Sequence, residues 1–165
     1  MHALARHRLP EETRALWVVR TSMVSPRSIE RAVRLATRYG YNALFVQVRG
    51  RGDAYYRSSY EPRAETLASQ PADFDPLSYL IECADGTGLQ VHAWLNVFYV
   101  WSQPQLPRSR RHVVNRSPHW IARDINNRYQ MTTAGKVEGV YLCPSNLNVR
   151  AHTLKVFAEV AQRYP

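Results

Sequence analysis

The densest group of side chains able to bind a polar molecule lies in residues 49–56, Arg-Gly-Arg-Gly-Asp-Ala-Tyr-Tyr. Guanidinium groups and a carboxylate beside tyrosines can hold a hydroxyl-rich or anionic molecule through charge-assisted hydrogen bonds and stacking. We therefore predict substrate-binding roles for Arg49, Arg51, Asp53 and Tyr55. An Arg–Asp pair that only holds the loop in shape is also common. The catalytic residues thus remain unknown, and Asp53 is a weak candidate.

Alternation along two expected strands, residues 43–49 and 89–96, adds further candidates, because successive side chains of a strand point to opposite faces. One face of each strand is apolar, whereas the other is polar or aromatic and carries Phe45, Gln47, Arg49, His92, Trp94 and Asn96. Strands of a helix-covered parallel sheet are expected to be apolar on both faces. Two successive strands with such a face predict that it lines a site. Gln47 or His92 alone would be interpreted as a hydrogen-bonded core side chain.

Aromatic and histidine side chains near the end of the expected strand 89–96 and in the residues after it add further candidates. Trp94, Tyr99 and Trp101 suit a platform on which a sugar ring stacks, although aromatics that anchor a loop would give the same pattern. His112 and His119 lack the paired spacing of metal ligands, so we interpret them as exposed loop histidines and predict no metal site.

These side chains must be positioned by alternating strands and helices. Short apolar runs predict strands at 14–20, 43–48 and 89–96. Ser25-Pro26 and Asp75-Pro76 each resemble an N-cap followed by proline at the first helical position, and they predict two helices. A final helix is expected at 148–164, after a long excursion in which residues 137–142 form either a strand or an extended loop.

This β-α-β-α-β order predicts an α/β fold with parallel strands joined by right-handed crossovers. Both a doubly wound sheet and a (β/α)8 barrel have this order. The turn after the first strand, Arg-Thr-Ser-Met-Val-Ser-Pro, has no glycine, which argues against dinucleotide or P-loop binding. We expect no cofactor. In a barrel, Arg49 and Asn96 would fall at the carboxyl ends of the strands, where barrel active sites lie.

Length and charge limit the possibilities further. The chain has 165 residues, fewer than the roughly 250 of a closed barrel, and 45% of them are hydrophobic. Its net charge of +9 is almost entirely arginine, but the arginines at 27–38 and 108–116 lack the interleaved aromatics of a single-strand binder. We interpret them as solvated faces and disfavour a nucleic-acid partner. Two cysteines sixty positions apart predict neither a disulfide framework nor a metal knuckle.

Three segments resemble the glycosyl hydrolase-like 10 family: residues 14–20 (RALWVVR), 44–56 (LFVQVRGRGDAYY) and 91–96 (VHAWLN). The resemblance runs from about Arg14 to the C-terminus. It implies a (β/α)8 glycoside hydrolase barrel of which this chain forms three to four β/α units, with residues 1–13 as an N-terminal extension and 14–165 as the partial barrel domain. It also implies O-glycosyl hydrolysis, with bacterial cell-wall glycan as the substrate. By resemblance and alternation, the cleft is expected to contain Arg49, Arg51, Asp53, Tyr55, His92, Trp94, Asn96 and Trp101.

Two departures from the family accompany this resemblance. Residues 141–145 resemble the family's Tyr-Leu-Asp-Pro-Gly, but Cys143 and Ser145 replace the aspartate and the glycine. The fourth strand, whose aspartate is the family's favoured catalytic carboxylate, would follow Pro165. We therefore expect the 165 residues to bind glycan without cleaving it, and open barrel edges to favour self-association or complementation by another chain.

A second interpretation remains open, a non-catalytic basic α/β module that binds carbohydrate or nucleic acid. No apolar run approaches the roughly 18 residues of a membrane span. No signal peptide is visible, and the compartment stays undetermined.

Overall fold

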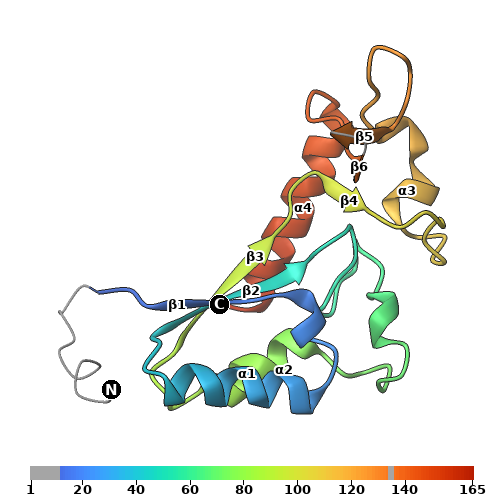
Figure 1. The fold of residues 1–165 in the computed structure, drawn as a ribbon. Coiled ribbons are helices and arrows are strands. Elements are labelled where there is room, and N and C mark those ends of the chain that lie inside the picture. The colour runs from blue at the N-terminus through green and yellow to red at the C-terminus, as the bar shows by residue number, and fades with distance from the viewer. Residues whose placement is uncertain (1–11, 134–135) are drawn as a thin grey trace.

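The computed structural model describes residues 12–133 and 136–165, and it divides into two small sheets with their helices (Figure 1). In chain order the strands and α-helices are β1 (Ala15–Val18), α1 (Pro26–Arg38), β2 (Ala43–Arg49), α2 (Pro76–Ala84), β3 (Gln90–Leu95), β4 (Tyr99–Trp101), α3 (Val113–Arg116), β5 (Gln130–Thr133), β6 (Lys136–Tyr141) and α4 (Leu147–Arg163). Short 3-10 turns lie at Arg20–Ser22, Glu65–Leu67 and Pro118–Trp120.

The first sheet confirms the predicted parallel arrangement, with strand order β1-β2-β3. Both predicted caps are present. The side-chain oxygen of Ser25 accepts from the amide of Ser28 at the start of α1, and that of Asp75 accepts from the amides of Leu77 and Ser78 at the start of α2. These caps satisfy amides that the first turn of a helix leaves unpaired.

The predicted alternation of faces along β2 is also confirmed. Leu44, Val46 and Val48 are fully buried in the core beneath α1 and α2, which lie side by side against one face of the sheet (Figure 1). Phe45, Gln47 and Arg49 therefore point to the opposite face, which neither α1 nor α2 covers. The successive βα units make this part of the chain the N-terminal portion of a TIM-like barrel.

The long excursion after β3 contains an element that the sequence did not predict, an antiparallel sheet of order β4-β6-β5. The segment predicted as either strand or loop is strand β6, and part of the predicted loop is strand β4. This sheet and α3 lie beyond the carboxyl ends of β2 and β3 (Figure 1), with a second apolar core that includes Val100, Val113 and Leu142. It therefore stands next to the edge at which a barrel-type site is expected.

Helix α4 connects the two halves of the structure. Asn146 caps it by accepting from the amides of Asn148 and Val149. Val149 packs in the second core, whereas Val160, three turns later, packs in the first. The buried face between them carries Val156 and two polar residues, His152 and Glu159.

Candidate glycan-binding site

The uncovered face of the parallel sheet carries a connected group of aromatic rings. Strand register places Trp17 beside Phe45 and Phe45 beside His92. Their ring centroids lie 5.1 and 5.2 Å apart, and Trp94 packs edge-on against Trp17 at 4.8 Å. Offset and edge-to-face pairs at these distances stabilise one another beyond the area that they bury.

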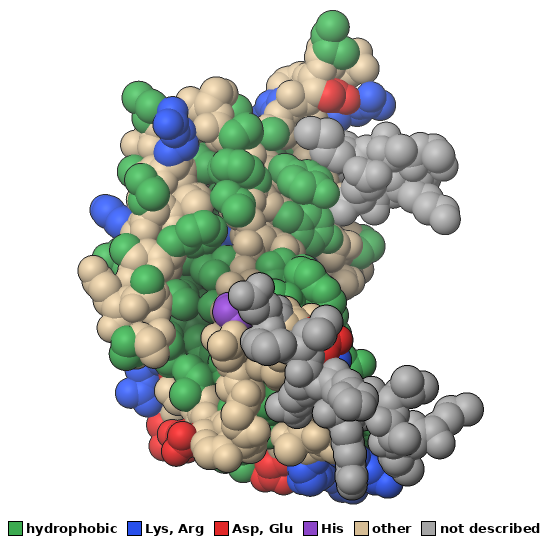
Figure 2. Space-filling view, turned by 90° about the vertical axis from the view of Figure 1, so that its left-hand side faces the viewer, with side chains coloured by type: hydrophobic (Ala, Val, Ile, Leu, Met, Phe, Trp, Pro, Cys, Tyr) green, Lys and Arg blue, Asp and Glu red, His purple; other side chains and the backbone are tan. Residues whose placement is uncertain are grey.

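These rings are reachable from solvent. Trp17 is 61% exposed and His92 is exposed, whereas Phe45 and Trp94 are half-buried. Figure 2 shows hydrophobic side chains gathered over the middle of the face on the β1 side, with a histidine among them. A contiguous exposed apolar area of this kind marks a binding surface or a surface that further protein covers.

Polar groups border the rings at the carboxyl ends of the strands. The indole of Trp94 donates to Oδ1 of Asn96 at 2.9 Å, and the Asn96 amide donates to the carbonyl of Gly50 at 2.8 Å. Across the sheet, Oε1 of Gln47 accepts from the backbone N–H of Arg20 at 3.2 Å and from its guanidinium at 3.3 Å. We call Arg20, Gln47, Trp94 and Asn96 the rim. Each is held by a neighbour at the edge where barrel enzymes bind their ligands.

A buried ionic cluster lies at the same edge, made of Arg49, Glu61 and His152. Arg49 donates through Nε and Nη2 to Oε1 of Glu61 at 2.9 and 2.7 Å, and His152 Nε2 lies 3.1 Å from the same oxygen. Nη1 of Arg49 donates to the carbonyls of Asn96 and Val97. The cluster thus ties the end of β2, the loop to Glu61, the β3–β4 turn and α4 together.

The surroundings of Glu61 keep it ionised. Burial raises the pKa of its carboxyl group, but the hydrogen bond to His152 and the charge of Arg49 together outweigh burial, so the pKa lies below its ordinary value. Its second oxygen, Oε2, has no hydrogen-bond partner within the described part of the chain. Glu61 is 1% exposed and Arg49 also 1%, so neither meets solvent in this structure.

The loop that follows Arg49 is folded inward. Oδ1 of Asp53 accepts from the amide of Arg51 at 2.9 Å, and the Arg51 guanidinium lies over the ring of Trp101 at 4.8 Å. The Tyr55 hydroxyl lies 2.7 Å from that of Thr66, and the Trp101 indole donates to the carbonyl of Gln105 at 2.7 Å. Each of the four predicted site residues in these contacts is at least 92% buried: Arg51, Asp53, Tyr55 and Trp101. These interactions engage the Asp53 carboxylate, the Tyr55 hydroxyl and the face of the Arg51 guanidinium within the loop, while Nε of Arg51 has no hydrogen-bond partner among the described residues.

The structure therefore separates the eight predicted site residues into two groups. One group lies on the accessible face or its border and consists of His92, Trp94 and Asn96. The other is buried and consists of Arg49, Arg51, Asp53, Tyr55 and Trp101. The two groups meet where Arg49 donates to the carbonyl of Asn96 and where Asn96 donates to that of Gly50.

One histidine prediction is wrong. His112 is 2% exposed, not a solvated loop residue, because it caps α3 and packs against Trp101. Its Nδ1 accepts from the amide of Val114, so Nε2 carries the proton and donates to the carbonyl of Arg51 at 2.8 Å. Burial lowers the pKa of His112. His119 is exposed, as predicted.

Arg20, Glu61 and His152 also belong to this region, although the sequence did not predict them as site residues. An arginine at the end of a buried strand calls for an acidic partner, but nothing local indicates that this partner lies twelve residues later. His152 had a signal, because it follows Val149 by three residues and precedes Val156 by four on the buried face of a helix.

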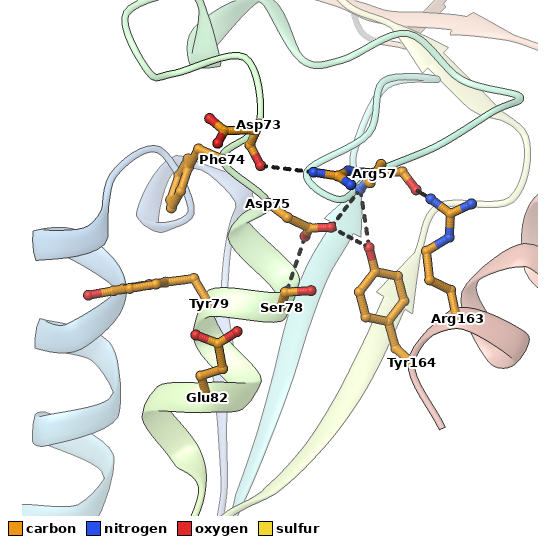
Figure 3. Close-up of a pocket in the computed structure, with 9 residues that line it drawn as sticks. All are labelled: Arg57, Asp73, Phe74, Asp75, Ser78, Tyr79, Glu82, Arg163 and Tyr164. Carbon is orange, nitrogen blue, oxygen red and sulfur yellow. Dashed lines mark hydrogen bonds between the residues drawn. The ribbon is translucent and has the colours of Figure 1, made fainter.

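The structure also contains a pocket of about 690 Å³ between the start of α2 and the end of α4, beside Arg57 (Figure 3). Its polar groups are largely engaged with one another. Oδ2 of Asp75 accepts from the Tyr164 hydroxyl at 2.6 Å and from the amide of Arg57 at 3.0 Å, and Arg163 donates to the Arg57 carbonyl. This arrangement joins two helices and leaves few groups for a ligand.

Residues 12–133 and 136–165 contain no group of three or more potential metal ligands, and no helix among them is long and apolar enough to cross a bilayer. Cys83 and Cys143 are both free thiols.

Fold and site together define a class, the α/β proteins of barrel type whose ligand-binding residues follow the strands at their carboxyl ends. The chain belongs to the glycosyl hydrolase-like 10 family, whose model matches residues 12–165. This membership confirms the resemblance noted in the sequence.

Relatives are similar over part of their own length. The chain is 33% identical over 95 residues to "Glycosyl hydrolase YngK" of Bacillus subtilis (strain 168), covering 54% of this chain and 19% of that protein. It is 27% identical over 133 residues to "Glycosyl hydrolase DigH" of Escherichia coli (strain K12), covering 78% of this chain and 29% of that protein. The chain thus spans less than a third of the length of either relative.

A solved structure supports the fold. The crystal structure of a hypothetical protein from Ruminiclostridium thermocellum ATCC 27405 superposes with a TM-score of 0.62, covering 90% of this chain and 71% of that one. At 14% sequence identity, this likeness concerns the fold alone.

Proposed function

We propose that this chain provides a glycan-binding wall of a glycoside hydrolase barrel that cleaves O-glycosyl bonds, with bacterial cell-wall glycan as the substrate class. One observation carries the proposal: exposed aromatic rings on the uncovered sheet face meet fixed amide and guanidinium groups at the carboxyl edge. Rings that stack on the apolar face of a sugar, beside groups that hydrogen-bond its hydroxyls, are what carbohydrate recognition requires.

Within this proposal the residues divide their roles. Trp94 stacks on a sugar ring, while Asn96 and His92 hydrogen-bond its hydroxyl groups. Arg49, Arg51, Asp53, Tyr55 and Trp101 are positioning residues, because their polar groups hold the loop and the β3–β4 turn beneath the rim.

Hydrolysis by the 165 residues alone is not expected. Glycoside hydrolysis ordinarily uses two carboxyl groups, about 5–5.5 Å apart for retention or about 6.5–9.5 Å for inversion. The carboxyl groups that the described residues place beneath the rim belong to Asp53 and Glu61, and both are buried and engaged. Neither can reach a glycosidic oxygen as the structure stands. We therefore propose binding without cleavage for this chain.

The test is calorimetric titration of the purified chain with N-acetylglucosamine tetramer, together with an assay for released reducing ends. We expect binding that weakens about tenfold in Trp94→Ala, the loss of roughly 1.4 kcal/mol for one stacked ring. Tyr39→Ala removes an exposed aromatic ring at the end of α1, away from the rim, and serves as the control. No release of reducing ends is expected.

Two results would contradict the proposal. If Trp94→Ala and Tyr39→Ala weaken tetramer binding equally, the glycan does not bind at the rim. Cleavage that disappears in Asp53→Asn would instead make Asp53 catalytic, and the binding-only role would be wrong.

The non-catalytic basic module remains as the second function. A steep fall of DNA or RNA affinity with salt, on a log–log plot, would favour it, because released counterions dominate such binding. Binding of the neutral tetramer that does not change with salt would favour the glycan wall.

A further inference from the structure

Three arginines lie at the carboxyl edge, and they differ in how their charge is balanced. Arg49 is paired with Glu61 at 2.7 Å, and Arg51 lies 3.9 Å from Asp53. Arg20 forms no ion pair with any described residue. The hydrogen bond that its guanidinium donates to a described residue goes to the neutral Oε1 of Gln47. Among the three, Arg20 is therefore the guanidinium whose charge no carboxylate of the described residues offsets.

Arg20 is held in place in spite of this. It begins the 3-10 turn Arg20–Ser22 at the end of β1, where the amide of Met23 donates to its carbonyl at 3.0 Å. Its side chain lies directly over Gly50, so closely that a Cβ at that position would collide with the Arg20 Cδ. Gly50 is also the residue whose carbonyl receives the Asn96 amide. The guanidinium is thus fixed on the same backbone segment as the Asn96 and Trp94 side chains.

The remaining donors of this guanidinium are available. Arg20 is half-buried, and within residues 12–133 and 136–165 its Nε and Nη2 groups have no hydrogen-bond acceptor. A planar guanidinium with free donors binds carboxylates and other planar anions in preference to neutral hydroxyls. Partial burial strengthens the attraction, because solvent screens such a pair less than it screens one at the open surface.

We infer that Arg20 is a specificity-determining residue that binds a carboxylate carried by the glycan, next to the sugar ring stacked on Trp94. This inference rests on the proposed glycan-binding function and adds the class of sugar that the wall selects. The carboxylate can be a uronic acid group on the ring or a lactyl ether on a hexosamine, and the same guanidinium chemistry would hold either.

The experiment measures affinity for matched pairs of oligosaccharides. One pair is tetragalacturonate and its methyl ester, and the other is a tetrasaccharide of alternating N-acetylglucosamine and N-acetylmuramic acid and its methyl ester. The wild-type chain should bind the acid form of one pair at least fivefold more tightly than the ester, and added salt should reduce this preference. The pair that shows the preference identifies the source of the carboxylate.

Three variants assign the preference to Arg20. Arg20→Gln should abolish the acid-over-ester preference, because it should weaken binding of the acid form more than binding of the ester. Arg20→Lys should retain part of it as a point charge. Arg34→Gln makes the same charge change on the outer face of α1, where the side chain is 66% exposed, and should leave the preference intact. Dispersed amide spectra check that each variant folds.

The outcomes distinguish a failure of the role of Arg20 from a failure of the proposed glycan-binding function. If the wild-type chain binds N-acetylglucosamine tetramer but shows no preference for an acid form, the role of Arg20 is wrong and the glycan wall stands. Equal loss in Arg20→Gln and Arg34→Gln also overturns it, because only net charge would then matter. If no oligosaccharide binds the folded chain, the proposed function itself fails.

Discussion

The carboxyl edge of the parallel sheet holds two groups of similar side chains that behave in opposite ways. The buried cluster of Arg49, Glu61 and His152 pairs its charges internally, whereas the rim, with Arg20 and Trp94, leaves guanidinium donors unpaired and keeps an aromatic ring partly exposed. Residue type alone does not distinguish them, since each contains an arginine. The difference lies in which partner the fold supplies, and so one group contributes stability and the other recognition.

The largest expected effect separates the two groups by stability. Glu61→Ala leaves Arg49 buried without its carboxylate, and we expect a loss of about 3–5 kcal/mol in the free energy of unfolding. Urea denaturation measures it. Glu82→Ala, an exposed carboxylate on α2, is the control and should change stability by less than about 0.5 kcal/mol. Equal effects of the two changes would mean that the buried cluster stabilises nothing.

A smaller effect tests how tightly the inward loop is packed. Gly52 has φ +72°, and a Cβ there would lie 3.2 Å from Nε2 of His112. Gly52→Ala should cost about 1–3 kcal/mol, from the left-handed backbone and the crowding together.

Gly86→Ala provides the matched measurement for this loop, because Gly86 has φ +68° but nothing within 4 Å of an added Cβ. Gly86→Ala should lower the free energy of unfolding only by the cost of placing alanine in the left-handed backbone conformation, about 1 kcal/mol. If Gly52→Ala is no more destabilising than Gly86→Ala in thermal melts, the loop yields easily and its rigidity does not support the rim.

The smallest effect is a dependence of stability on pH. The folded-state pKa of Glu61 is lowered, so its contribution is present above the pKa of an unfolded glutamate and is lost as pH falls through the folded value. Glu61→Gln should flatten that part of the stability curve relative to wild type. Parallel curves for the two proteins in acid would contradict a lowered pKa.

The sequence predicted the parallel half of the fold because its signals are local. These signals are the Ser25-Pro26 cap, the Asp75-Pro76 cap and the alternation along residues 43–49. Each involves neighbours in the chain, and the structure confirms all of them. The antiparallel sheet escaped prediction because its strands pair across register irregularities and arise within a segment rich in proline and arginine.

The candidate site was predictable only in part for the same physical reason. Trp94 and Asn96 could be found from alternation along one strand. The burial of Arg49 depends on Glu61 and on His152, which lies 91 residues from Glu61 in the chain, and no local pattern records such a pairing. Arg20 was overlooked because its importance comes from lacking an acidic partner, which only the packed structure reveals.

The central claim, that glycan binds at the rim and not in the buried loop, is tested most directly through the four tryptophan indole N–H signals in NMR spectra. On titration with N-acetylglucosamine tetramer, the signals of Trp94 and Trp17 should shift with ligand concentration. Those of Trp101, whose indole donates to Gln105, and of Trp120 should stay in place. Shifts confined to Trp101 or Trp120, or no shift at any of the four, would contradict the account.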